Sequence, residues 1–73
     1  MRKLRIVVAD DHALMRRGIC DLLKSEPGWE IVAEASNGRE AVAAVDKTKP
    51  DVLVIDLAMP ELNGLTATRE ILR

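Results

Sequence analysis

The sequence predicts an α/β fold built on a parallel sheet, because short apolar runs alternate with amphipathic segments along its 73 residues. Three runs have the length of strands, and each is followed by a segment with apolar residues at helical spacing. Such alternation joins parallel strands by right-handed crossovers. Strands are expected at residues 4–9, 29–35 and 52–55, and helices at 13–24, from 37 to near 49, and from 63 to 73.

The three strand segments differ in their apolar pattern. Residues 4–9 form a nearly continuous apolar run, which is typical of a strand buried on both faces. Residues 29–35 alternate, and the charges of Glu30 and Glu34 favour a partly exposed edge strand. Residues 52–55 are apolar throughout, which indicates a third strand in the centre of the sheet.

The first helix is expected to place one apolar stripe on the sheet, formed by Leu14, Met15, Ile19, Leu22 and Leu23. Gly18 falls in the same stripe, where the helix backbone could approach the sheet closely. Cys20 falls among charged residues and is expected to be exposed, with an intermolecular disulfide as its main hazard. The pair Arg16 and Arg17 is expected to form a solvated helix face.

The second helix has recognisable start and stop signals. Asn37 followed by Glu40 resembles a capping box, and Pro50 follows the last turn near Lys49. Trp29, the only aromatic residue, is expected to cover the sheet edge, and it has no aromatic partner for stacking nucleobases.

Composition excludes several classes of function. The chain is 48% hydrophobic and 32% charged, as expected of a folded globular domain. Eleven basic residues nearly balance twelve acidic ones, so no basic field exists for nucleic acid or for an acidic membrane. The single cysteine allows no intramolecular disulfide, and no apolar run is long enough to span a bilayer. The cytoplasm is the expected compartment.

Three carboxylates follow predicted strands. Asp10 and Asp11 come directly after the first strand, and Asp56 comes directly after the third. Taken alone, the pair could cap a helix and Asp56 could be a turn residue. If the two strands are neighbours, the carboxylates converge at one crevice, and their repulsion favours a divalent cation such as Mg²⁺. A carboxylate placed there can attack a phosphoryl group to form an acyl phosphate.

Together these residues resemble the receiver domain of response regulators, and more narrowly the subfamily with a LuxR-type helix-turn-helix output domain. The matching positions run from Leu4 to Arg73 and include Asp10-Asp11-His12, then Leu14, Arg17 and Gly18, then Asp56-Leu57-Ala58-Met59-Pro60, and Asn63-Gly64. The resemblance implies a flavodoxin-like sheet of strand order 2-1-3, as the (βα)3 portion of a (βα)5 receiver.

The resemblance also implies roles at the matching positions. Asp56 corresponds to the phosphoacceptor, and Asp10, Asp11, Asp56 and the backbone carbonyl of Ala58 correspond to the Mg²⁺ site. The loop after the acceptor is shaped by Met59, Pro60 and Gly64. His12 is expected to be an exposed or capping residue and is not included in the site.

The chain departs from the family pattern after Arg73. Residues 1–73 correspond to a partial receiver domain, and the remaining strands and any DNA-binding domain are absent from the sequence. The family's switch Ser or Thr and its phosphoryl-pairing Lys lie in that missing part, and neither Lys47 nor Lys49 matches the lysine. We therefore expect a phosphoacceptor module and no enzyme, with impaired transfer in these 73 residues. The implied partner is a sensor histidine kinase in two-component transcription control.

Three other functions can be weighed against this interpretation. A non-catalytic fragment would keep the first half of the sheet and self-associate through the uncovered strand 52–55, giving a homo-oligomer. A phosphatase of the haloacid-dehalogenase type needs an acidic residue two positions after its nucleophile, where Ala58 stands. A nucleotide-binding fold lacks support, because no glycine-rich turn follows the first strand.

Overall fold

Five elements alternate along residues 2–56, which are the residues that the computed structural model describes. They are β1 (Leu4–Ala9), α1 (Ala13–Lys24), β2 (Trp29–Ala35), α2 (Gly38–Thr48) and β3 (Val52–Ile55). Each element expected within this range is confirmed. The helix expected at 63–73 lies outside the described residues.

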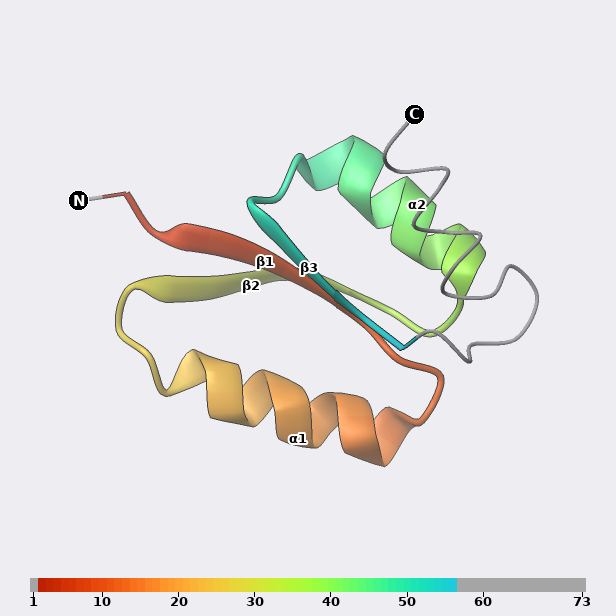
Figure 1. Ribbon diagram of the computed structural model, residues 1–73, viewed down its shortest axis with the longest axis horizontal. Helices are drawn as coiled ribbons and strands as arrows, with labels where there is room; N and C mark the ends of the chain where they lie inside the picture. Colours follow the sequence, from red (N-terminus) through yellow and green to blue (C-terminus); the bar gives the residue numbers. More distant parts are fainter. Residues whose placement is uncertain (1, 57–73) are drawn as a thin grey trace.

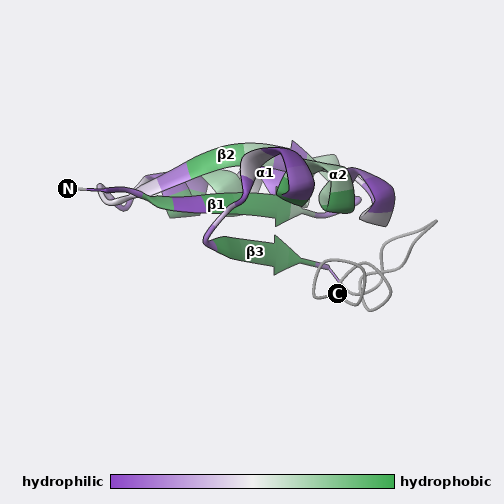
Figure 2. Ribbon diagram, turned by 90° about the horizontal axis from the view of Figure 1, so that it is seen from above, coloured by the Kyte–Doolittle hydropathy of each residue, from purple (hydrophilic) through white to green (hydrophobic). Residues whose placement is uncertain are grey.

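The strands form a parallel sheet of order β2-β1-β3, as expected (Figure 1). β1 lies between its two partners, which explains why its residues from Ile6 to Ala9 are buried. The expectation that β3 is central is wrong for the described sheet, where it pairs with β1 alone and Val52 is exposed. Its uniformly apolar sequence (green in Figure 2) reflects cover on the two faces of the strand, which does not require a strand on both edges.

The two helices cover opposite faces of the sheet (Figure 1). This follows from the strand order, because right-handed crossovers in opposite directions put successive helices on opposite sides. On the α1 face, Ile6, Val8 and Cys20 form the buried cluster. On the α2 face, the buried cluster consists of the small residues Ala9, Ala35 and Ala41.

The orientation of α1 differs from the expected one. Cys20 is 2% exposed and packs against β1, whereas Leu14 is 86% exposed. Of the expected stripe, Ile19 and Leu23 contact the sheet cluster, while the others face outward. Gly18 makes no close approach, because a Cβ added there would meet nothing within 4 Å. The apolar residues of α1 span more of its circumference than the sheet covers, so periodicity alone placed the contact face wrongly.

The burial of Cys20 changes its expected chemistry. Burial, and then the nearby Glu34 carboxylate, raise the pKa of the Cys20 thiol. The thiol is therefore less reactive than that of an exposed cysteine. The expected intermolecular disulfide is disfavoured as well, because the Cys20 residue is buried.

The ends of α2 follow the sequence signals with one difference. The Asn37 side chain accepts a hydrogen bond from the Glu40 N–H at 2.9 Å, as a cap residue should. The Glu40 carboxylate accepts from the N–H and hydroxyl of Ser36, both at 2.7 Å, instead of from Asn37. At the other end, Lys49 adopts a left-handed conformation with φ of 50° and donates its N–H to the Val45 carbonyl. Neither α1 nor α2 has the length and hydrophobicity of a membrane-spanning helix.

Candidate functional site

The sheet brings Asp10 and Asp56 together at the carboxyl ends of β1 and β3. β1 and β3 are adjacent and parallel, with Ala9 opposite Ile55, so the next residue of each strand is an aspartate. The Asp56 N–H donates to the Ala9 carbonyl at 3.0 Å, and the Asp10 N–H donates to the Ala35 carbonyl at 3.0 Å. The hydrogen-bonding pattern of the sheet therefore continues for one residue and fixes the backbone of both aspartates.

The register of β3 is also held at its other end. The Asp51 carboxylate accepts a hydrogen bond from the Arg5 N–H at 2.9 Å, and the Asp51 N–H donates to the Arg5 carbonyl at 2.8 Å. The bond from the Arg5 N–H is the main cause that lowers the pKa of Asp51, and the Arg2 guanidinium adds to it. Because a parallel strand cannot slip at one end only, this pairing helps to place Asp56 beside Asp10.

Asp10 is the buried member of the site, at 7% exposed. Its Oδ1 accepts a hydrogen bond from the His12 N–H at 2.8 Å, immediately before α1 begins. This bond closes a turn before the helix and does not cap it, because His12 is the N-cap residue of α1 and the helix has no side-chain cap bond, so the capping interpretation is not confirmed for Asp10. A carboxylate that accepts from the backbone in this way keeps its other oxygen available for a further ligand.

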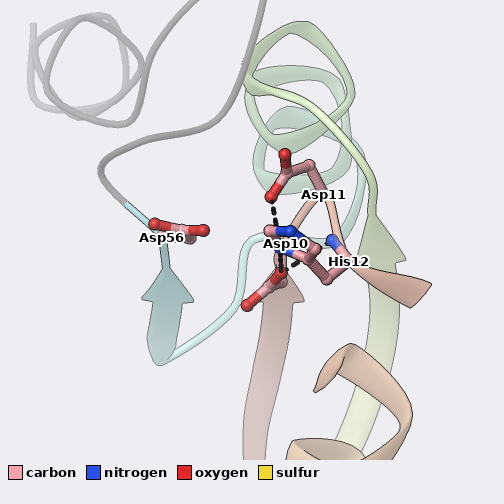
Figure 3. A group of neighbouring side chains, drawn as sticks. All are labelled: Asp10, Asp11, His12 and Asp56. Atoms are coloured by element: carbon pink, nitrogen blue, oxygen red, sulfur yellow. Dashed lines mark hydrogen bonds and ion pairs between the residues drawn. The ribbon is translucent and has the colours of Figure 1, made fainter. Parts of the chain in front are cut away.

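Asp11 carries the feature that most favours a cation. Its side chain is 27% exposed, yet its Oδ1 is buried and has no hydrogen bond within residues 2–56. The His12 ring is the nearest side chain of opposite polarity, with its Nδ1 3.0 Å from this oxygen (Figure 3). An ionised oxygen removed from water without a donor is costly, and a bound cation removes that cost.

The structure adds His12 to the three expected aspartates. Ligand atoms of Asp10, Asp11, His12 and Asp56 all lie within 4.8 Å of one another (Figure 3). The ring of His12 is exposed, as expected, but it faces the carboxylates and lies 3.6 Å from Asp10 Oδ1. The expected exposed position of His12 at the start of α1 is confirmed, and its proximity to the carboxylates does not make it a ligand. The position of His12 two residues after Asp10, at the start of a helix, was the sequence feature that could have predicted a ring close to these carboxylates.

The donor set fits a hard divalent cation. Clustered carboxylate oxygens are the ligands that Mg²⁺ prefers, and an open, partly exposed cluster leaves room for its retained waters. The remaining expected site residues, Ala58, Met59, Pro60 and Gly64, lie outside the described residues.

Arg16 is the residue of this region whose exposure was predicted wrongly from the sequence. It was expected on a solvated face together with Arg17, but its side chain is 19% exposed. The guanidinium donates to the Asp10 carbonyl at 2.7 Å and pairs with Glu34 at 3.2 Å. Arg17 is exposed, as expected. The two arginines therefore differ in role, although they are adjacent and chemically identical.

The comparisons with known proteins agree with this geometry. The response regulator receiver domain family matches residues 6–73, so the chain belongs to this family. The solved response regulator domain of Thermotoga maritima CheB is similar over 97% of this chain and 53% of its own, with TM-score 0.95 and 41% identity. A CheX-CheY-BeF3-Mg+2 complex from Borrelia burgdorferi is similar over 97% of this chain and 54% of that one, with TM-score 0.88 and 25% identity.

Two curated relatives are longer proteins with different activities. A protein-glutamate methylesterase/protein-glutamine glutaminase of Alkalilimnicola ehrlichii is 49% identical over 97% of this chain and 18% of its own length. The transcriptional regulatory protein DegU of Brevibacillus brevis is 44% identical over 97% of this chain and 30% of its own. The chain thus spans less than a third of either relative. The flavodoxin-like receiver fold is confirmed, while the LuxR-type subfamily stays a prediction.

Proposed function

We propose that this chain is a phosphoacceptor in two-component signalling, with Asp56 as the residue that accepts the phosphoryl group. The observation that carries the proposal is the position of Asp56 at the end of β3, within 4.8 Å of the Asp10 and Asp11 ligand atoms. Carboxylates this close repel one another, and a bound cation offsets that repulsion. Membership of the receiver family supports the same role.

The donor in this proposal is a phosphohistidine of a sensor kinase. An Asp56 carboxylate oxygen attacks the phosphorus, forming the O–P bond as the N–P bond breaks. The bonding electron pair stays on the histidine nitrogen, and the ring leaves neutral because its other nitrogen carries a proton. The product on this chain is an acyl phosphate. The backbone hydrogen bond from Asp56 to Ala9 holds the nucleophile at the sheet edge during this step.

Mg²⁺ is the proposed cofactor, held by Asp10, Asp11, Asp56 and the carbonyl of Ala58. When bound, it neutralises charge on the carboxylates and on the transferring phosphoryl oxygens. The Borrelia burgdorferi complex contains Mg together with BeF3, which supports Mg²⁺ as the cation for this chain as well. The chain's own contribution is the hydrogen bond from the His12 N–H to Asp10 Oδ1, which holds this carboxylate in place.

The cellular compartment of this chain and the process that it controls are proposed from its membership of the receiver family. A sensor kinase and this chain meet in the cytoplasm, and the segment itself contacts neither nucleic acid nor membrane. Control of transcription would pass through a DNA-binding domain beyond residue 73. The relation to DegU supports this output, although the relation to methylesterases leaves a different effector as the alternative.

The test uses acetyl phosphate with Mg²⁺ and intact mass spectrometry. We expect these 73 residues to gain one phosphoryl group slowly and incompletely, because none of them supplies the lysine that would stabilise the transferring charge. A chimaera completed with the later strands of the Thermotoga maritima CheB domain should be modified fully. Asp56→Asn should abolish the gain in both chains, and Asp46→Asn, on the exposed side of α2, should not. Full modification of the Asp56→Asn chimaera, or none of the unaltered chimaera, would refute the role of Asp56.

A second candidate function is self-association through β3. In the described sheet this strand pairs on one side only, and it contains no lysine or proline to block a further strand. This function does not depend on phosphoryl transfer. Its test is the oligomeric state of the chain in solution, measured by light scattering.

A further inference from the structure

Arg16 joins three parts of the molecule that surround the acidic site. It lies in the first turns of α1, and its Nη1 donates to the backbone carbonyl of Asp10 at 2.7 Å. Its Nε lies 3.2 Å from Glu34 Oε1, on β2. The Arg16 side chain is 19% exposed, and its bond to the Asp10 carbonyl is partly buried, whereas the pair with Glu34, whose side chain is 47% exposed, lies nearer to water.

The bond to the Asp10 carbonyl constrains Asp11. This carbonyl belongs to the peptide group between Asp10 and Asp11, and a peptide group is planar. A fixed carbonyl oxygen therefore fixes the orientation of this peptide plane, and with it the position of the Asp11 nitrogen and Cα. The N–H of Asp10 is already bonded to Ala35, so the backbone is held on both sides of Asp10. The direction of the Asp11 carboxylate then depends on few remaining rotations.

Glu34 solves an electrostatic difficulty in this arrangement. An isolated guanidinium beside the site would repel a divalent cation and compete for the aspartate oxygens. Glu34 pairs with Arg16 and balances its charge, while the planar group presents a second N–H to the carbonyl. Within residues 2–56, Arg16 thus acts on the backbone of the site and forms no hydrogen bond with the carboxylate of Asp10 or Asp11.

The geometry points to Arg16 as a positioning residue for the cation site, which sets the affinity for Mg²⁺ by holding the Asp10–Asp11 peptide. This inference rests on the proposed function, because it requires that the three aspartates bind the cation. It differs from a purely structural role, in which Arg16 would stabilise the packing of α1 and leave affinity for the cation unchanged.

The test compares Arg16→Gln with the matched control Arg17→Gln. Mg²⁺ is titrated while the backbone amide shifts of Asp11 and Asp56 are followed by NMR. Partners that orient metal ligands typically change affinity by about 10–100-fold, so we expect about tenfold or more weakening for Arg16→Gln. Arg17 is exposed and makes no hydrogen bond or ion pair within residues 2–56, so its variant should bind as the unaltered chain does.

Arg16→Lys separates geometry from charge and remains informative if Arg16→Gln does not fold. A lysine keeps the charge, but one ammonium lacks the fork that reaches Glu34 and the Asp10 carbonyl together. We expect affinity for Mg²⁺ to fall for this variant as well. Affinity equal to that of the unaltered chain would overturn the positioning role.

The controls separate failure of this inference from failure of the proposed site. Asp11→Asn should remove the Mg²⁺ response, which establishes that the shifts report the acidic cluster. If the unaltered chain shows no response, the metal site is wrong and the inference falls with it. If the response depends on Asp11 but is the same in Arg16→Gln and Arg17→Gln, the site stands and only the role of Arg16 is refuted.

Discussion

Asp11 is the aspartate of the acidic cluster whose Oδ1 is buried without a hydrogen bond in the described part of the chain. The His12 Nδ1 lies 3.0 Å from this oxygen. In a site built for stability alone, such an oxygen would be satisfied by the backbone, as Asp10 is by the His12 N–H. The contrast between these neighbouring aspartates indicates that Asp11 is placed for a ligand.

Replacing Asp11 should therefore stabilise the metal-free chain. We expect Asp11→Asn to raise the free energy of unfolding by about 1 kcal/mol without Mg²⁺, because it removes a repelled and unsatisfied charge. Added Mg²⁺ should stabilise the unaltered chain by mass action and leave the variant unchanged. Urea titrations with and without Mg²⁺ measure both effects, and Asp46→Asn serves as the surface control. Destabilisation of metal-free Asp11→Asn would contradict this account.

At the scale of elements, the strands and caps could be predicted, while the rotation of α1 could not. The run in β1 and the pairing of Asn37 with Glu40 are local signals, which depend on adjacent residues alone. The face that α1 turns to the sheet depends on which residues of β1 and β2 it meets. For that reason Cys20 and Arg16 were placed outward by sequence and inward by the structure.

A pair of adjacent leucines tests the rotation of α1. Leu22 is exposed, whereas Leu23 packs against the cluster that contains Ile6 and Val8. We expect Leu23→Ala to cost about 2 kcal/mol of unfolding free energy and Leu22→Ala about 0.5 kcal/mol or less. Chemical denaturation of the two variants measures both losses. Equal losses, or a larger loss at Leu22, would restore the orientation expected from the sequence.

The pairing of β3 with β1 should depend on pH through Asp51. Its pKa in the folded chain is lowered, first by the hydrogen bond from Arg5, so ionised Asp51 favours folding. This contribution is present above the ordinary carboxyl pKa and is lost as pH falls through the lowered value. Asp51→Asn should lower the urea midpoint at neutral pH, and its difference from the unaltered chain should shrink in acid. A difference that stays constant with pH would contradict this linkage.

At the scale of the whole molecule, the placement of Asp10 beside Asp56 followed from the strand order, which the family resemblance supplied. Composition and spacing alone left the neighbour of the first strand open. What sequence could not show was how the site is supported, since Arg16 and Glu34 are 18 positions apart and meet only in the folded chain. Long-range contacts of this kind depend on the complete packing of helix on sheet.

Self-association is the prediction that concerns the molecule as a unit. The apolar β3 pairs on one side in the described sheet, and α1 exposes several large apolar side chains. We therefore expect a dimer or larger assembly whose melting temperature rises with concentration. Light scattering behind a sizing column, with melts over a roughly hundredfold concentration range, measures this. A monomer with a concentration-independent melting temperature would contradict it.

The most direct test of the central claim is to locate the phosphoryl group. After reaction with acetyl phosphate and Mg²⁺, borohydride reduces an acyl phosphate to an alcohol, which marks the modified aspartate for peptide mass spectrometry. We predict that the mark in this chain, and in the completed chimaera, lies on Asp56 and depends on Asp11. A mark on Asp10 or Asp11, or none in the completed chimaera, would contradict the assignment of Asp56 as the phosphoacceptor.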